Sequence, residues 1–401
     1  MPGVPRVSVI IVSRHRATAL VRCLTALQQQ DHPQIEVIVV ADPDGMAAID
    51  GFAVKRAVFD QANISAARNI GLRLAAAPVV AFIDDDAVAE PTWAARLAAP
   101  FDDPQVVAST GFVRGRNGIS FQWQASEVDA SGFDHPLAVQ GVTLRAGTPA
   151  RAIKTQGTNC AFRRETLMRI GGFDPAYRFY LDEADVNLRL AGLGLTAIVP
   201  DAQVHHGFAK GPLRRADRVP RSLHDIGAST AVFLRRHGGA ASVRASLVAR
   251  ERARALRHMV AGRIEPRDVT RLMQSLQDGW VDGSARNLPV LTPLPQDAPD
   301  FLPFPGTGPR PGRVMAGRIW QAAACRAAAA QAVARGEVVT LLLLSPDVRP
   351  HWQNFTSDGV WEQTGGLFGR SDRSGPRVVR GWLSQRIAAE TRRISMVRPI
   401  G

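Results

Sequence analysis

Residues 79–86 read VVAFIDDD, an apolar run that ends directly in three consecutive aspartates. The β-branched and aromatic side chains predict a buried strand. Asp84, Asp85 and Asp86, at its carboxyl end, would repel one another strongly unless a cation neutralised them. Mg²⁺ and Mn²⁺ take oxygen ligands, commonly one or two carboxylates together with substrate phosphates. The stretch therefore predicts a strand whose end holds a divalent metal, against the simpler alternative of a solvated acidic turn.

The same pattern of apolar strand and polar end occurs twice upstream. Residues 7–12 and 35–40 are β-branched runs, and polar clusters follow them at 13–16 and 42–45. A helical pattern separates the first two runs, and residues 64–77 have helical composition before the third. Alternating strands and helices predict an α/β fold with a mostly parallel sheet covered by helices. Ligands bind beyond the carboxyl ends of such strands, so three strands deliver polar groups to one edge.

The chain of 401 residues is long enough for two or three domains. We divide it into a catalytic domain at 5–240, a basic helical extension at 241–288, a linker rich in proline and glycine at 289–312, and a C-terminal region at 313–401. Helical patterns at 182–190, 223–236 and 242–263 follow the third strand. The C-terminal region contains an alanine-rich helix at 319–335 and an apolar strand at 338–344, which predict a small α/β segment of open role.

The three cysteines are odd in number and form no CxxC pair, which favours a reducing compartment over a disulfide framework. No apolar run reaches the roughly 20 residues that span a bilayer, and the first residues lack the order of a signal peptide. We therefore expect a cytoplasmic protein.

Charge is divided unevenly along the chain. Residues 1–213 hold 20 Lys/Arg and 21 Asp/Glu, a net charge of −1, whereas residues 214–401 hold 29 and 15, a net charge of +14. The basic half predicts either contact with a polyanionic surface such as anionic phospholipid or a merely solvated arginine-rich surface. It lacks interleaved aromatic residues and any nucleic-acid motif, so we expect no nucleic acid partner.

Six sequence elements, in order, resemble glycosyltransferase family 2, whose members have the Rossmann-like GT-A fold. The resemblance covers roughly residues 5–240, a little over half of the chain. The elements are VIIVSR at 9–14, VVAD at 39–42, ARNIG at 67–71, FIDDD at 82–86, GTNCAFRR with GGFD between 157 and 174, and DEAD at 182–185. The resemblance implies a GT-A domain with a C-terminal helical extension and a small C-terminal α/β segment.

The resemblance also implies an activity. Members transfer a sugar from a nucleotide diphosphate donor, here a UDP-, GDP- or dTDP-sugar, to an acceptor hydroxyl with inversion at the anomeric carbon. A divalent metal, Mn²⁺ or Mg²⁺, offsets the charge that builds on the leaving diphosphate. A carboxylate base removes the proton of the acceptor hydroxyl. The acceptor is a saccharide or a lipid-linked saccharide, since bacterial relatives often build polysaccharides of the cell envelope, and the enzyme would contact the inner face of the membrane peripherally.

Site residues follow from matching positions. Asp84 and Asp86 are the expected metal ligands, and His205 is favoured over His206 as the third. Glu183 matches the base, although the order Asp182-Glu183 reverses the family's usual pair and leaves Asp182 as a rival. The expected donor-binding residues are Ser13, Arg14, Asp42, Arg68, Asn69, Asp84 and Asp85, and the expected acceptor-side residues are Gly157, Asn159 and Asp185.

Two other function classes use similar residues. A sugar-1-phosphate nucleotidyltransferase also needs aspartates and a metal, but it would carry a glycine-rich basic loop after the first strand, and residues 13–16 contain no glycine. A binding protein derived from an inactive transferase would have lost a carboxylate motif, and both motifs are present.

Overall fold

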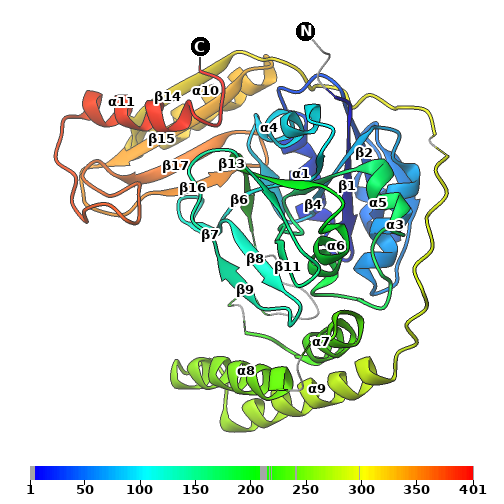
Figure 1. The fold of residues 1–401 in the computed structure, drawn as a ribbon. Helices are drawn as coiled ribbons and strands as arrows, with labels where there is room; N and C mark the ends of the chain where they lie inside the picture. Colours follow the sequence, from blue (N-terminus) through cyan, green and yellow to red (C-terminus); the bar gives the residue numbers. More distant parts are fainter. Residues whose placement is uncertain are drawn as a thin grey trace.

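The structure, a computed structural model, describes residues 5–207, 215, 217, 219–239, 242–297 and 299–400. These residues form a large mixed sheet with helices on both faces, a helical bundle below it, and a smaller α/β unit that contains the C-terminal helix (Figure 1). The α/β class predicted from the sequence is confirmed.

The large sheet has ten strands in the order β10-β13-β6-β12-β4-β1-β2-β3, with β5 beside β13 and β7 beside β6. Six of them, β1 to β4, β6 and β13, point in the same direction, and β12 runs antiparallel between β4 and β6. The predicted strands at 7–12, 35–40 and 79–83 are confirmed as β1, β2 and β4. The strands are β1 (Val7–Ser13), β2 (Ile35–Ala41), β3 (Lys55–Val58), β4 (Val79–Asp84), β5 (Ala87–Ala89), β6 (Val106–Arg114), β7 (Phe121–Trp123), β10 (Thr143–Ala146), β12 (Cys160–Arg163) and β13 (Leu195–His206).

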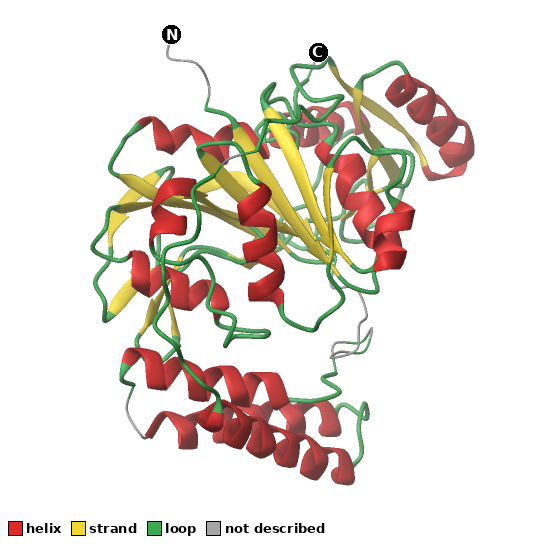
Figure 2. Cartoon of the chain, turned by 90° about the vertical axis from the view of Figure 1, so that its right-hand side faces the viewer, coloured by secondary structure: helices red, strands yellow, loops and turns green. Residues whose placement is uncertain are grey.

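Two apolar cores lie on opposite faces of this sheet. Side chains alternate along a strand, so Val9 and Ile11 of β1 face one core and Ile10 faces the other. Figure 2 shows the strands between helices on both sides. The covering helices are α1 (Ala17–Leu27), α2 (Pro43–Ala48), α3 (Ile64–Leu74), α4 (Trp93–Ala98) with the short 3-10 helix η1 (Ala99–Asp102), α5 (Arg164–Arg169) and α6 (Asp182–Leu190).

A small antiparallel sheet and three helices follow. The sheet has the order β11-β8-β9, from β8 (Ser126–Asp129), β9 (Asp134–Pro136) and β11 (Arg151–Ile153). The bundle consists of α7 (His224–His237), α8 (Ser242–Val260) and α9 (Pro266–Ala285). Gly238 ends α7 with a φ of 73°, a left-handed conformation that glycine adopts without strain. Helix α7 packs on α9 and also buries Phe233 against Tyr177 and Leu181 of the catalytic domain, so it joins the two parts.

The proline- and glycine-rich segment runs in an extended form along the catalytic domain. Its main-chain N–H groups at Leu294 and Phe304 donate to the carbonyls of Met168 and Ile35. The ring of Phe304 is buried in the same core as β1 and β2. The predicted linker is therefore an extended strap that is bonded to the catalytic domain along its length.

The C-terminal unit has a four-stranded sheet in the order β14-β15-β17-β16. The predicted helix at 319–335 and strand at 338–344 are confirmed as α10 and β15. Its elements are β14 (Gly312–Arg318), the 3-10 helix η2 (Ile319–Gln321), α10 (Ala322–Ala334), β15 (Val338–Ser345), β16 (Trp352–Phe355), β17 (Trp361–Gly366) and α11 (Leu383–Ile394). Among the described helices, none combines the length and the apolarity that a bilayer crossing requires.

A buried ion pair fixes the C-terminal unit to the catalytic domain. Arg398 forms two bonds to the carboxylate of Glu90, of 2.6 and 2.8 Å, and both side chains are 1% exposed. Burial would raise the pKa of Glu90, but Arg398 and His205 hold it at about 2. The guanidinium of Arg398 also lies 3.9 Å from the ring centre of Trp361. Because a buried charge is costly without its partner, we infer that the two units do not separate readily.

Candidate active site

The ends of β4 and β13 bring three metal-ligating side chains together. One carboxylate oxygen each from Asp84 and Asp86 and one ring nitrogen of His206 lie within 4.8 Å of one another. His206 Nε2 is 3.2 Å from Asp86 Oδ1 and 4.0 Å from Asp84 Oδ2. Asp86 and His206 are buried, whereas Asp84 is partly exposed. Two carboxylates and an imidazole form a donor set suited to Mn²⁺ or Mg²⁺.

The third member of this cluster corrects an expectation. The sequence favours His205 as the ligand, but neighbouring side chains on β13 point to opposite faces. The Nε2 atom of His205 is 2.7 Å from Glu90 Oε1, and its ring lies 5.2 Å from that of Trp361. His206, on the other face, takes the position beside the aspartates.

Asp85 faces away from the cluster, toward β1 and the loop after it. Its carboxylate accepts hydrogen bonds from Ser13 Oγ at 2.7 Å and Arg16 Nη1 at 3.0 Å. Burial raises the pKa of Asp85 to about 6, against the opposing effect of Arg16. Burial also raises the pKa of Asp84, with Asp86 adding to the shift. A bound cation would oppose these shifts because it favours the ionised carboxylates.

A second pair of polar groups lies at the end of β2. Asp42 is 2% exposed, and its Oδ2 is 3.2 Å from His15 Nδ1. Its other oxygen, Oδ1, is buried and has no hydrogen-bond partner among the described residues. Arg14 Nε donates to Asp60 Oδ1 at 2.8 Å. One carboxylate oxygen of Asp42 is therefore left without a hydrogen bond from the described residues.

Arg68 of α3 connects the metal cluster with α6. Its Nη1 is 2.5 Å from Asp182 Oδ2, and its Nη2 is 3.5 Å from Asp84 Oδ1 and donates to the Gly157 carbonyl at 2.9 Å. The guanidinium lies 5.2 Å from the ring centre of Phe173. A Cβ at Gly157 would lie 3.1 Å from Arg68 Nη2, so this close approach favours glycine. Arg68 thus holds one carboxylate from each of the two acidic motifs.

Two asparagines that the resemblance assigned to substrate are instead used inside the fold. Asn69 accepts from the main-chain N–H of Phe173 at 2.8 Å and donates to its carbonyl at 2.7 Å. Asn159 is fully buried, accepts from Trp93 Nε1 and donates to two main-chain carbonyls. The amide of Asn159 is fully engaged by protein groups, and that of Asn69 forms two bonds to the main chain of Phe173.

Asp185 departs from its expected acceptor-side role in the same way. It is buried on α6 and is paired with Arg189 at 2.6 Å and with His237 of α7 at 3.0 Å. These partners outweigh burial and lower the pKa of Asp185. The side chain fastens α6 to the bundle.

In the acidic motif at 182–185, the side chain of Glu183 is half-buried. The side chain of Asp182 is buried and is paired with Arg68. Burial, followed by the charge of Asp182, raises the pKa of Glu183 to about 7, although Lys154 opposes the shift. Tyr180 and Leu181, directly before α6, have φ values of 75° and 65°. Such conformations are strained for side chains of this size, and they cluster at functional sites.

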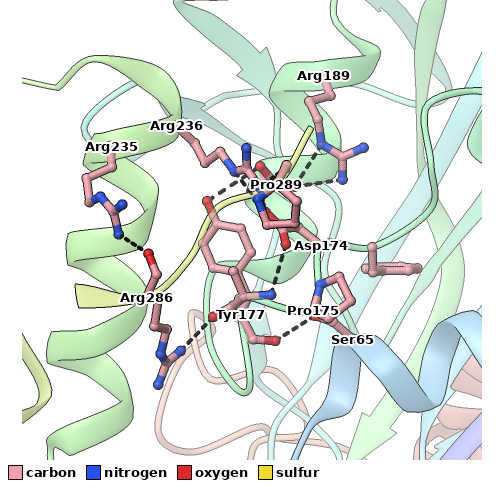
Figure 3. Close-up of polar contacts among 12 residues, drawn as sticks. Ser65, Asp174, Pro175, Tyr177, Arg189, Arg235, Arg236, Arg286 and Pro289 are labelled. Atoms are coloured by element: carbon pink, nitrogen blue, oxygen red, sulfur yellow. Dashed lines mark hydrogen bonds and ion pairs between the residues drawn. The ribbon is translucent and has the colours of Figure 1, made fainter. Parts of the chain in front are cut away.

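Arginines of the bundle hold the turn that precedes α6 (Figure 3). Arg236 of α7 is 2.8 Å from Asp174 Oδ2, and Arg286 donates to the Ala176 carbonyl at 2.6 Å. From the other side, Ser65 of α3 donates to the carbonyl of Tyr177 at 2.7 Å. The turn that positions Glu183 is therefore fixed between α3 and the bundle.

Sequence reasoning missed Lys154 and Trp123. Lys154 forms two 2.8 Å bonds to Asp134, and its pKa, which burial would lower, is raised by Glu183 and Asp134. The ring of Trp123 lies 5.4 Å from that of His206. Both residues come from the irregular region between β6 and β12, where no motif marks which side chains turn toward the site.

Comparisons with known proteins agree with this geometry. Residues 8–171 match the family model described as glycosyl transferase family 2. The chain is 26% identical over 182 residues to a glucosyl-dolichyl phosphate glucuronosyltransferase of Haloferax volcanii, and the alignment covers 42% of this chain and 56% of the relative. The chain thus spans little more than half the length of that relative.

Solved structures show weaker similarity. The mannosyltransferase PcManGT from Pyrobaculum calidifontis, in complex with GDP-Man and Mn²⁺, is 20% identical, with a TM-score of 0.43 over 70% of this chain and 87% of its own. GalNAc-T7 with UDP, GalNAc and Mn²⁺ is 15% identical, with a TM-score of 0.44 over 59% and 48%.

The family match begins in β1, includes the aspartates after β4 and extends to the turn before α6. The curated relative that aligns with 182 residues of the chain is named as a glucuronosyltransferase. Residues 8–171 of this chain therefore belong to glycosyl transferase family 2.

Proposed function

We propose that this enzyme transfers a sugar, with inversion, from a nucleotide diphosphate donor to a hydroxyl of a saccharide or lipid-linked acceptor. The observation that carries the proposal is the bridge of Arg68 between Asp84 and Asp182. It links a metal cluster to a second acidic motif whose free carboxylate, Glu183, has a raised pKa. A metal-stabilised leaving group and a separate base are the two requirements of single displacement.

On the donor side, Asp84, Asp86 and His206 would hold Mn²⁺ or Mg²⁺, which supplies Lewis-acid stabilisation of the leaving diphosphate. The unused Oδ1 of Asp42 would accept a hydrogen bond from an N–H group of the nucleobase. Ser13 and Arg16 hold Asp85, and through it they fix the loop that carries the two ligands. Arg14, whose Nε atom donates to Asp60, would lie beside the nucleobase of the donor.

On the acceptor side, Glu183 would remove the proton of the attacking hydroxyl. A base whose pKa is about 7 is about half ionised at neutral pH and is still basic enough to take a proton. Asp182 is the poorer candidate because its carboxylate is engaged by Arg68. We assign Asp182 a positioning role and Glu183 the role of base, and direct attack by the hydroxyl that Glu183 activates would invert the configuration at the anomeric carbon.

A panel of nucleotide sugars with Mn²⁺ or Mg²⁺, scored by thermal unfolding, tests the proposal. Bound donor stabilises the fold by mass action, by about 2.7 kcal/mol at a concentration 100 times Kd. We expect one donor class to raise the melting temperature in the presence of metal. Absence of stabilisation by every UDP-, GDP- and dTDP-sugar with either metal would contradict the proposal.

We further propose that the acceptor is lipid-linked and that the bundle contacts an anionic membrane. The Haloferax relative is named for a glucosyl-dolichyl phosphate, which supports this acceptor class. Helix α8 carries exposed Val248, Leu256 and Val260, the last 84% exposed. Arg252 and Arg257 are exposed on the same helix and form no ion pair among the described residues. Apolar side chains flanked by arginines are typical of helices that lie in a membrane interface.

We expect the double variant Arg252→Gln/Arg257→Gln to partition onto anionic liposomes about 30-fold less than the wild type, because each basic residue near an anionic leaflet contributes on the order of 1 kcal/mol. Co-sedimentation at several salt concentrations measures this, and salt should weaken binding by the wild type. Arg145→Gln/Arg380→Gln removes the same charge from exposed positions outside the bundle and serves as the control. Wild-type protein that stays in the supernatant at low salt would rule out the membrane contact.

A further inference from the structure

A groove of about 550 Å³ lies between β7 and the C-terminal unit. Phe121 and Gln122 of β7, Arg116 of the preceding turn, and Trp352 of β16 line it, together with Asp217 and Arg263. Neither the family motifs nor the metal cluster includes any of these residues.

We propose that this groove binds a saccharide chain of the acceptor, away from the hydroxyl that reacts, and that the C-terminal unit contributes Trp352 to it. The inference rests on the proposed transfer to a saccharide or lipid-linked saccharide and adds a site that holds the acceptor's further sugar units.

Aromatic side chains provide the first argument. Trp352 is 51% exposed, and Phe121 and Trp123 are exposed as well. Two of them, Trp352 and Phe121, line the groove itself, and exposed aromatic residues gathered at one concave surface indicate a binding site more than single exposed residues do. Sugar rings present flat faces of C–H groups, which pack on aromatic faces while their hydroxyls stay at the rim.

Polar groups of both signs provide the second argument. Arg116, Arg263 and Asp217 line the groove beside the aromatic residues, and Asp217 is paired with Arg215 at 3.0 Å. The Oε1 atom of Gln122 makes no hydrogen bond within the described part of the chain. A ligand rich in hydroxyl groups uses donors and acceptors equally, whereas a lipid tail would leave these groups unpaired.

Continuity with the metal cluster provides the third argument. Phe121 and Trp123 point to the same face of β7, about 7 Å apart along the strand. Trp123 lies against His206 of the cluster, and Phe121 lines the groove. Strand β7 therefore leads from the metal cluster into the groove, and an acceptor chain can follow it.

The walls of the groove are fixed to each other. The main-chain N–H of Gln353, next to Trp352, donates to the Asn117 carbonyl at 2.8 Å. Gly118 has a φ of 66°, and a Cβ at this position would lie 2.4 Å from the Gln353 carbonyl oxygen. The turn that contains Gly118 is therefore in direct contact with β16. Sites for small molecules are commonly preformed in this way.

The test uses the full-length protein with UDP and Mn²⁺ on an array of defined neutral and acidic oligosaccharides of two to six units. We expect Trp352→Ala to weaken binding to every glycan that the wild type binds by about tenfold or more, as for truncation of an aromatic residue at the centre of an interface. Trp382→Ala is the matched control, since Trp382 belongs to the same unit, is 78% exposed and does not line the groove. Melting temperatures should be equal for both variants.

Calorimetry of nucleotide diphosphates with Mn²⁺ separates this inference from the proposed function. Wild type and Trp352→Ala should bind the nucleotide equally. If nucleotide binds but the wild type captures no glycan, or if Trp352→Ala captures glycans as strongly as the wild type, the groove is not a saccharide site and the transferase proposal stands. If no nucleotide diphosphate binds, the transferase proposal itself fails.

Discussion

Replacement of Glu183 by glutamine is expected to preserve donor binding and to reduce turnover about 10²–10⁴-fold, the range attributed to general base catalysis. The amide keeps the shape of the side chain but cannot accept the proton of the acceptor hydroxyl. Steady-state kinetics with the identified donor and acceptor measures the effect, which should fall on kcat with little change in the donor's KM.

The pH profile of the wild type gives an independent check on Glu183. Burial and the charge of Asp182 raise the pKa of Glu183 to about 7, so the base is protonated in acid and ionised in alkali. The rate should therefore increase with pH up to about 7 and level off above it.

Asp182→Asn is the matched comparison. This change weakens the ion pair between residue 182 and Arg68. It should make the position of Arg68 less fixed, and it leaves the carboxylate of Glu183 in place. If Asp182→Asn abolishes turnover while Glu183→Gln remains active, the base is Asp182.

Asp86→Ala and His206→Ala are each expected to weaken metal-dependent binding of nucleotide diphosphates more than about 100-fold. Groups that only support metal ligands already contribute 10–100-fold to metal affinity, so loss of a ligand should cost more. Calorimetric titration of UDP, GDP and dTDP in Mn²⁺, repeated in EDTA, measures the effect. Wild-type affinity that is equal in Mn²⁺ and EDTA would show that nucleotide binding needs no metal.

The neighbouring histidine supplies the control for this experiment. His205→Gln changes an imidazole that contacts Glu90 on the opposite face of β13. It should leave the metal dependence intact and affect the junction with the C-terminal unit instead. A variant at His205 that loses metal dependence would restore the original assignment.

The sequence was sufficient for the elements that carry the metal cluster, because long β-branched runs have few alternatives to buried strands. It could not decide between His205 and His206. In β13, residues 200–202 are inserted opposite a single step of β6, between the pairs Val199–Gly111 and Gln203–Phe112. A bulge changes which face the following side chains occupy, so counting from the apolar residues upstream does not predict the outcome.

Buried polar residues within the motifs posed a different difficulty. The motif at 182–185 contains three acids, and α6 places Asp182 and Asp185 one turn apart on a buried side, whereas Glu183 is partly exposed. The partners that bury them, Arg68 and His237, come from distant segments. A local pattern therefore located the motif, while tertiary contacts decided which acid stays accessible.

The pairing of Glu90 with Arg398 has a consequence for biosynthesis. The two residues are 308 positions apart, an interval that a ribosome covers in about 15–60 s at 5–20 residues per second. During that time the residue directly after β5 is a buried carboxylate without its arginine. We expect the nascent catalytic domain to stay protease-sensitive near β5 until the C-terminal unit emerges, so that the enzyme matures only after translation has passed Arg398.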